Sequence, residues 1–557
     1  MIGDFKVKFE ELIHFFFIPI AIGLIGGASA YVFRIVVKFF TTIFDAVFIF
    51  HSSYFVFITM PLIFYLSNFL ISHHLISSSN VTLDNIAKKI SLMSGKFSHI
   101  KGFLVLLLSS FSIGFGVPIG REGPIAKLGG LSTEVFTKLI KTPRINLPIY
   151  LSAGISAAIA ATFNAPIAGI ILGIEIIIGR INSYIIIPLI VACTTATLVS
   201  REFIGDFTAF YVPHLSYENI YLVFVPVEAL LLGAITVVIT LSLRKFRILR
   251  VKYRKRWNLV VIVLGFLVGL TIFLVPKSAG VGYNYINDIF QYNFNSAVAL
   301  KIMIAKIIGI IFSIGSGIFG GMMSPSIFIG AFGGYWFGSE AVAYGVDPRV
   351  FALAGSAAVL SGISKAPLRS SIIITELTHS YQLLVPILIA SSISGYIASK
   401  FEPGSYFKRS LLQRGIDIES SVINRYLQKR NLNKFIDNIS PISSNENIRV
   451  VLKIFKRLHI RYLPVVDDDK LIGVVSLRDV RKRYILRQKN IKVKDIMSER
   501  PFAIEKEHTT DDIFKAIAVL NVHYVPYVDK QGKYIGMIDL DKLIKDLSIS
   551  IQNYRIN

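Results

Sequence analysis

Two charged residues stand inside a glycine-rich, apolar stretch of the sequence. Arg121 and Glu122 lie between Gly120 and the pair Gly123 and Pro124. Charged side chains are costly inside a membrane and usually functional there, and broken helices are tolerated at that depth only where they line a cavity or pack within protein. A helix that starts in such a place offers free N–H groups and the positive end of its dipole to an anion. Close packing through small residues would explain the glycines but not the charges. The pattern predicts an anion site.

The segment has a second copy later in the chain. Phe111–Gly114 (FSIG) recurs as Phe312–Gly315, an offset of 201 residues (312 − 111). At the same offset, glycine, proline and glutamate positions match without a gap: Gly116 with Gly317, Gly120 with Gly321, Pro124 with Pro325, Gly129 with Gly330, Pro166 with Pro367, and Glu175 with Glu376. A constant offset through such residues indicates an internal duplication, and duplicated transporter halves form their site where they meet.

The elements that must position this site are membrane helices. Of the 557 residues, 53% are hydrophobic and 17% are charged, whereas soluble domains carry roughly 25% charged residues. Apolar stretches of about 20 residues, the length of a membrane-spanning helix, recur along the chain: Ile13–Val37, Phe103–Val117, Ile220–Leu243, Leu259–Val275, Ile302–Phe319 and Leu383–Ala398. The composition predicts a polytopic α-helical membrane protein in a lipid bilayer.

The charge is uneven, with a net charge of +24 and a basic cluster between Arg244 and Arg256. Because this cluster is short and lies between two predicted spans, the positive-inside rule explains it as a cytoplasmic loop. Nucleic acid is therefore not an expected partner. The single cysteine, Cys193, and the ten histidines show no metal-site spacing, so no metal is expected. Enzymatic activity is not expected either, because the sequence has no P-loop and no paired nucleophile and base.

After about Lys400 the sequence becomes more charged and strand-like. His459–Asp467 (HIRYLPVVD) parallels Asn521–Asp529 (NVHYVPYVD), and each copy has an apolar helix-like run before it and another strand after it. Two such α/β units would bury their apolar faces against one another. The tail is predicted to be a soluble tandem module.

These motifs resemble those of the CLC family of chloride channels and Cl⁻/H⁺ antiporters. The resemblance rests on Gly120–Pro124 (GREGP) with Phe163–Gly169 (FNAPIAG), on Gly321–Pro325 (GMMSP) after Gly315–Gly317, and on Glu376 before YQL. It covers about residues 10–416. The tail resembles the tandem CBS domains that many CLC proteins carry.

The resemblance implies a CLC fold of two inverted-topology repeats plus an α/β cytoplasmic CBS pair. The expected boundaries are 1–416 for the transmembrane domain, with halves at about 10–243 and 257–416, then 417–437 for a linker, 438–490 for the first CBS copy and 491–557 for the second. It also implies a homodimer with one pore per subunit, in the plasma membrane, with both termini in the cytoplasm.

By the same resemblance, Glu122 matches the family's gating glutamate, whose carboxylate competes with anions for the outermost site. A carboxylate beside helix N-termini mimics a bound anion, and protonation removes its charge. Backbone N–H groups would hold the anion, at Gly120, Arg121, Glu122 and Gly123 in one half and at Met322 and Met323 in the other. Glu175 and Glu376, at paired positions, are expected to fix helix ends or the dimer.

Three positions depart from the family pattern. Val81 stands at the place of the pore serine, Phe407 at that of the inner pore tyrosine, and Ile176 at that of the inner proton-relay glutamate. The first two supply no hydroxyl donor to a central anion, and isoleucine cannot titrate. These residues favour passive or weakly proton-coupled chloride conduction gated by Glu122.

Other functions remain open from the sequence alone. The main alternative is a Cl⁻/H⁺ antiporter that uses Glu122 with water or Glu175 as the relay. Fluoride export is less favoured because Met322 stands where that branch of the family has an acid. A CBS-regulated divalent cation transporter is also less favoured, because cation paths use rings of carboxylates or carbonyls and acids are sparse here.

The tail carries one pattern for a nucleotide. Gly473–Asp479 fits the Gly-x-x-Ser/Thr-x-x-Asp pattern of CBS domains, which makes Ser476 and Asp479 candidate ligands of an adenine nucleotide. The second copy has Lys542 at the acidic position. A pair that serves only as a dimerising scaffold is the alternative, because a fold resemblance does not establish a ligand.

Overall fold

The structure is a computed structural model that describes most of the chain. Outside the described residues are 1–11, 51–52, 74–98, 143–145, 175–182, 206–208, 292–293, 403–434, 459, 461, 478, 482–490, 500, 502, 506–523, 530, 540–541 and 543–557. The chain divides into two compact units, one comprising Met1–Ile90 with Gly95–Gln413 and the other Ser91–Ser94 with Arg414–Asn557.

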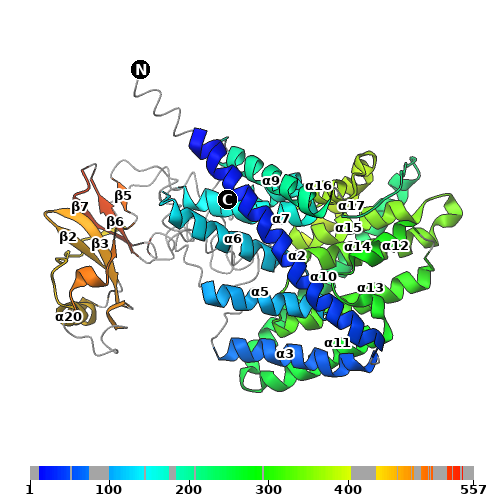
Figure 1. Ribbon diagram of the computed structural model, residues 1–557, viewed down its shortest axis with the longest axis horizontal. Helices are drawn as coiled ribbons and strands as arrows, with labels where there is room; N and C mark the ends of the chain where they lie inside the picture. Colours follow the sequence, from blue (N-terminus) through cyan, green and yellow to red (C-terminus); the bar gives the residue numbers. More distant parts are fainter. Residues whose placement is uncertain are drawn as a thin grey trace, which may run out of the picture. The chain divides into compact units, whose positions relative to one another are not determined.

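The first unit is built from helices (Figure 1). Those of the first half are α2 (Ile18–Phe50), α3 (Val56–Ser72), α5 (His99–Gly114), α6 (Glu122–Leu139), α7 (Leu147–Phe163), α8 (Pro166–Leu172) and α9 (Ser183–Ile204). Those of the second half are α10 (Tyr221–Lys252), α11 (Trp257–Leu274), α12 (Tyr283–Gln291), α13 (Ser296–Ser316), α14 (Met323–Glu340), α15 (Pro348–Ser364), α16 (Pro367–Thr378) and α17 (Leu384–Phe401).

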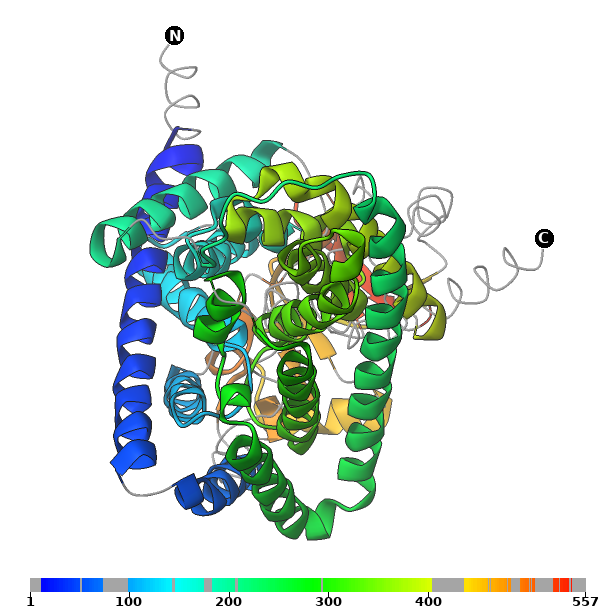
Figure 2. The same cartoon turned by 90° about the vertical axis from the view of Figure 1, so that its right-hand side faces the viewer.

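The helix boundaries repeat at the offset seen in the sequence. A shift of 201 residues places Glu122–Leu139 on Met323–Glu340 and Leu147–Phe163 on Pro348–Ser364. The same shift carries α2 onto residues 219–251, which is nearly the whole of α10. Figure 2 shows these two long helices along opposite sides of the unit. The register therefore starts the second repeat at α10, whereas the expected halves kept residues up to 243 in the first.

The two halves interrupt their helices with the same local chemistry. Asn164 (φ 53°) ends α7 and Lys365 (φ 58°) ends α15, both in the left-handed conformation that closes many helices. Pro166 and Pro367 then occupy the first turns of α8 and α16, where a helix needs no N–H donor. The short helices α8 and α16 follow these breaks in the two halves.

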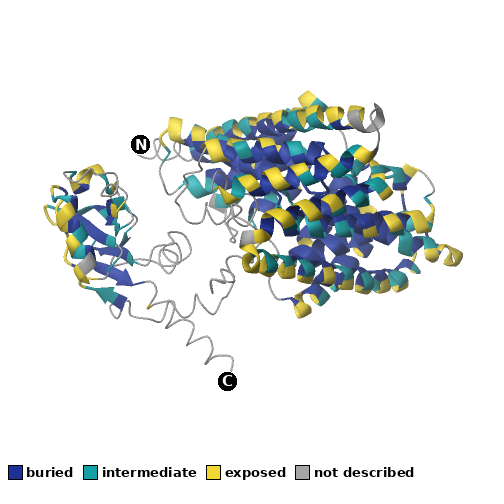
Figure 3. Cartoon of the chain, turned by 90° about the horizontal axis from the view of Figure 1, so that it is seen from below, coloured by how far each residue is buried: buried dark blue, intermediate teal, exposed yellow. Residues whose placement is uncertain are grey.

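The outer faces of the first unit are apolar. Phe39 is 60% exposed, Leu198 65% and Leu259 67%, and Figure 3 shows exposed residues along the outer faces of helices whose inner faces are buried. Six helices among the described residues are long and apolar enough to cross a membrane. An apolar exterior around a polar-lined interior is what a bilayer requires.

The second unit contains two small sheets. One has the order β1-β7-β6-β5 and the other β2-β3-β4. The strands are β1 (Ile436–Asp437), β2 (Tyr462–Asp467), β3 (Lys470–Ser476), β4 (Ser498–Glu499), β5 (Ile504–Glu505), β6 (Tyr524–Val528) and β7 (Tyr534–Asp539), with helix α20 at Ile448–Leu458. The antiparallel hairpins β2–β3 and β6–β7 are the two copies of the tail repeat.

The hairpins of the two copies contact each other through their turns. The Leu471 N–H donates to the Gly532 carbonyl at 3.2 Å, and the Tyr534 N–H donates to the Asp469 carbonyl at 3.2 Å. Met537 of the second copy is buried in the apolar core of the first. The tandem therefore forms one packed module, as the repeat predicted.

Candidate functional site

A pair of glycines joins the backbones of the two repeats. The Gly120 N–H donates to the Gly321 carbonyl at 2.9 Å, and the Gly321 N–H donates back to the Gly120 carbonyl at 2.7 Å. These two residues occupy matching positions in the duplication, just before α6 and α14. The bridge therefore holds the N-termini of the two helices together. A Cβ at Gly321 would collide with the Glu122 carboxylate, so the absence of a side chain here leaves room for the carboxylate in its present position.

The Glu122 side chain crosses from one repeat to the other. It is the first residue of α6 and only 1% exposed. Its Oε1 accepts a hydrogen bond from the Ser324 N–H at 2.8 Å and another from the Ser324 hydroxyl. Ser324 is the second residue of α14, so the carboxylate sits at the positive end of that helix. This is the place where a free anion would bind.

Arg121 and Tyr283 complete the surroundings of this carboxylate. The Tyr283 hydroxyl donates to the Ser324 hydroxyl oxygen at 3.0 Å. The Arg121 guanidinium lies 5.0 Å from the ring centres of both Phe163 and Tyr283, within the range of cation–π attraction. Aromatic rings thus hold the cation next to the carboxylate.

A buried lysine supports the loop before the site. The Lys306 Nζ donates to the Ser278 and Gly280 carbonyls at 3.0 and 2.5 Å. The Gly280 N–H in turn donates to the Gly116 carbonyl at 2.7 Å. Gly116 has φ +85°, a conformation that glycine adopts readily. This chain of bonds ties the segment leading to Gly120 to the second repeat.

A second glutamate makes the reverse crossing. The Glu376 carboxylate, on α16, accepts hydrogen bonds from the N–H groups of Ile167 at 2.8 Å and Ala168 at 2.5 Å. These are the first-turn groups of α8, which belongs to the other repeat. The expectation that Glu376 fixes a helix end is confirmed. Each repeat therefore supplies a carboxylate to a helix N-terminus of the other repeat.

The structure brings together one group of the predicted residues and leaves another undescribed. Gly120, Arg121, Glu122, Gly123, Met322 and Met323 all lie at the junction of α6 and α14. Met322 and Met323 are 1% and 3% exposed. Val81, Ile176 and Phe407, and also Glu175, lie outside the described residues. Their predicted roles stay predictions.

Sequence reasoning missed Ser324, which donates to the Glu122 carboxylate, and Tyr283, which donates to the Ser324 hydroxyl. Ser324 directly follows Met322 and Met323, whose N–H groups were predicted to hold the anion, and its hydroxyl is a further possible donor at that place. Tyr283 gave no signal, since its place beside Ser324 arises only from the packing of α12 on α14.

The tail site is partly formed. The Ser476 hydroxyl donates to Asp479 Oδ2 at 2.5 Å, and the Asp479 N–H donates to the Ser476 oxygen at 3.2 Å. In the second copy, Lys542 Nζ lies 2.8 Å from Asp437 and 3.5 Å from Asp539. The hydrogen bond to Asp437 raises the pKa of Lys542, so this position holds a cation in an ion pair. Within the described part of the chain, no three His, Cys, Asp or Glu side chains are grouped to hold a metal ion.

Comparisons with known proteins match both units. A family model described as "Voltage gated chloride channel" matches residues 74–399, and a CBS domain model matches residues 436–485 and 493–549. A relative from Vibrio campbellii, "H(+)/Cl(-) exchange transporter ClcA", is 28% identical over 321 residues, which are 54% of this chain and 67% of that protein.

A second relative bears a channel name. The "Putative chloride channel protein ClcB-like" of Ralstonia nicotianae is 28% identical over 333 residues, 57% of this chain and 76% of that protein. Among solved structures, that of a eukaryotic CLC transporter matches with a TM-score of 0.65 and 17% identity, and the match covers 95% of this chain and 98% of the other. That last likeness shows the fold.

Proposed function

The chain belongs to the voltage gated chloride channel family and has the CLC fold with a C-terminal CBS pair, and from this we propose that it conducts chloride or a similar small anion through a pathway gated by Glu122. The observation that carries the proposal is the 2.8 Å hydrogen bond from the Ser324 N–H to the Glu122 carboxylate. A carboxylate in that place has the charge and the hydrogen bonds of a bound halide.

The gate works by exchange of one anion for another. While Glu122 is charged, its carboxylate occupies the N-terminus of α14 and excludes a halide. Protonation, or a competing anion, frees the Ser324 donors. The vacated Ser324 N–H then takes up the anion together with the N–H groups of Arg121–Gly123, Met322 and Met323, whereas the Gly120 N–H stays bonded to the Gly321 carbonyl. The Gly120–Gly321 bridge keeps both helix ends in place during the exchange.

The coupling is proposed to be passive or weakly proton-linked. The family includes relatives named as exchangers and relatives named as channels, so the choice rests on this chain's own residues. Ile176 removes a titratable group from the inner position that the resemblance assigns to proton relay.

A Cl⁻/H⁺ antiporter is the second candidate, and it is favoured by a different observation. Glu228 on α10 is fully buried, and no residue in the described part of the chain donates a hydrogen bond to its carboxylate.

Parallel flux measurements in vesicles test the proposal. Chloride efflux and proton movement are recorded from the same reconstituted protein, with Glu122→Gln as the variant and the exposed Glu218→Gln as its matched control. We expect chloride flux without uphill proton transport, and a flux in Glu122→Gln that no longer depends on pH. Proton uptake driven by a chloride gradient would favour the antiporter, and absence of chloride flux would refute anion conduction.

The assembly and the tail belong to the same proposal. We infer a homodimer with one pore per subunit, in the plasma membrane and with both termini in the cytoplasm. The proposed division is 1–416 for the membrane domain, 417–437 for the linker, and 438–490 and 491–557 for the CBS copies. An adenine nucleotide held by Ser476 and Asp479 would act on conduction from this tail. The hydrogen bonds between these two residues support a preformed site.

A further inference from the structure

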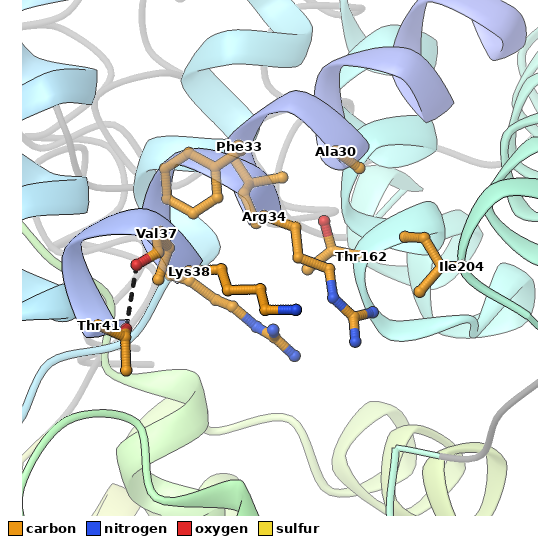
Figure 4. Close-up of a pocket in the computed structure, with 10 residues that line it drawn as sticks. Ala30, Phe33, Arg34, Val37, Lys38, Thr41, Thr162 and Ile204 are labelled. Atoms are coloured by element: carbon orange, nitrogen blue, oxygen red, sulfur yellow. Dashed lines mark hydrogen bonds between the residues drawn. The ribbon is translucent and has the colours of Figure 1, made fainter. Parts of the chain in front are cut away.

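A cavity beside the α6–α14 junction is lined by cations. Its volume is about 260 Å³, and residues of α2, α6, α7 and α9 line it. Arg34 and Lys38 extend into it from α2, as Figure 4 shows, and Arg121 lines it from the residue preceding α6. Thr162 lines it from α7. Glu122 and Ser324 do not line it, so the gating carboxylate lies outside this space, and Arg121 belongs to the surroundings of both.

The charges in this cavity all have the same sign. Arg34 and Lys38 are one turn apart on α2 and therefore share a face. None of the ten described residues that line the cavity is acidic. Cations within membrane-crossing helices are rare and mark cavities or ion paths. An anion in that space would be attracted to all three cations.

The volume is suited to a small anion with part of its hydration shell. A water molecule takes about 30 Å³ of liquid volume, so the space holds an anion together with several waters. Guanidinium groups match the oxygen geometry of phosphate and sulfate, and an ammonium group contributes a point charge. The lining is therefore able to bind halides as well as tetrahedral oxyanions.

We propose that Arg34, Lys38 and Arg121 form a second anion site, distinct from the Glu122 site, which takes a dissolved inorganic anion or the phosphate of an anionic lipid. Arg121 connects the two sites, because its guanidinium lies over Tyr283 beside the Glu122 site and the residue also lines the cavity. A dissolved anion held there raises the local concentration beside the gate. That role rests on the proposed function, whereas binding in the cavity does not.

The rate of a charged thiol reagent at a cavity cysteine tests the binding without any transport assay. The chain has one cysteine, Cys193, which is fully buried. Thr162→Cys adds a thiol to the cavity wall, and Ser216→Cys adds a reference thiol at an exposed loop position. The rates of a sulfonate-bearing and a trimethylammonium-bearing methanethiosulfonate are measured on the full-length protein in micelles. We expect the anionic-to-cationic rate ratio at position 162 to exceed that at position 216 by roughly tenfold, or about 1.4 kcal/mol.

Charge variants identify the source of this preference. Arg34→Gln with Lys38→Gln should bring the ratio at position 162 close to the reference, whereas Arg34→Lys with Lys38→Arg should keep it. Elution as a single species in size exclusion establishes that each variant is folded. An equal ratio at the two cysteines, or a preference that survives the glutamine pair, would overturn the proposal.

Two arms then distinguish the anion. Sulfate that slows the sulfonate reagent at position 162 equally in micelles and in phosphatidylglycerol vesicles identifies a dissolved anion. A reaction blocked in those vesicles but fast in lipid-free micelles identifies the lipid phosphate. If neither sulfate nor lipid affects the rate, the cavity is not an anion site, even where the same protein conducts chloride. Conversely, if the protein shows the charge preference but conducts no chloride, the proposed function is refuted and the cavity site still stands.

Discussion

At the residue scale, the proposed gate depends on how many donors hold one carboxylate. Glu122 Oε1 accepts from both the backbone N–H and the hydroxyl of Ser324. The importance of Glu122 could be predicted from its type and its glycine-rich surroundings. The donors could not, because Ser324 lies 202 residues away (324 − 122) in the chain and Tyr283 is outside any repeated motif. Only the folded chain brings them to the carboxylate.

Removal of the Ser324 hydroxyl should loosen the gate. Ser324→Ala keeps the backbone donor and loses the side-chain donor, and a hydrogen bond to a charged group contributes about 1.5–3 kcal/mol. We expect chloride flux at neutral pH to rise by roughly tenfold or more in reconstituted vesicles, limited by the open rate of the pore. Ser339→Ala is the matched control, since that hydroxyl bonds the Tyr335 carbonyl elsewhere on α14. A flux that falls to background in Ser324→Ala would contradict this view of the hydroxyl.

At the element scale, the interrupted helices explain why the two halves stay in register. The sequence offset indicated the duplication, and the structure shows that it carries helices such as α6 and α7 onto α14 and α15, because glycine and proline set the same breaks twice. It did not reveal that α8 and α14 each receive a carboxylate from the opposite repeat. That exchange depends on how the halves face each other, which no periodicity within one half encodes.

Loss of the Glu376 carboxylate should destabilise the first unit. Glu376→Ala leaves the N–H groups of Ile167 and Ala168 without their acceptor, and each buried unpaired group costs about 1–3 kcal/mol. We expect a lower midpoint of thermal unfolding in detergent, measured by the loss of the dimer or monomer peak in size exclusion after heating. The exposed Glu218→Gln should leave the midpoint unchanged. Equal midpoints for the wild type and Glu376→Ala would mean that the α8 cap contributes no stability.

At the scale of the whole molecule, a helical membrane unit is joined to a soluble tandem module. Composition and the two internal repeats were enough to predict both, because membrane helices and paired α/β units differ in charge and in apolar period. The ligand of the tail was not predictable in the same way. Ser476 and Asp479 are placed as the pattern expects, whereas Lys542 fills the second position with an ion pair.

The tail should therefore bind one adenine nucleotide per chain. We expect titration calorimetry on the full-length protein to give a single site for AMP, ADP or ATP. Asp479→Asn should weaken binding roughly tenfold or more, since a charged hydrogen bond to the ribose contributes about 1.5–3 kcal/mol. Lys542→Met, in the other copy, should not change the affinity. Absence of binding, or equal losses in both variants, would support a tail that serves as a scaffold.

The claim that Glu122 occupies an anion site is tested most directly by a heavy halide. Crystals of Glu122→Ala grown in bromide should show anomalous scattering at the N-terminus of α14, within hydrogen-bond reach of the Ser324 N–H, where the wild type should show none. Bromide that is absent from this position in Glu122→Ala while it binds elsewhere along the pathway would contradict the account.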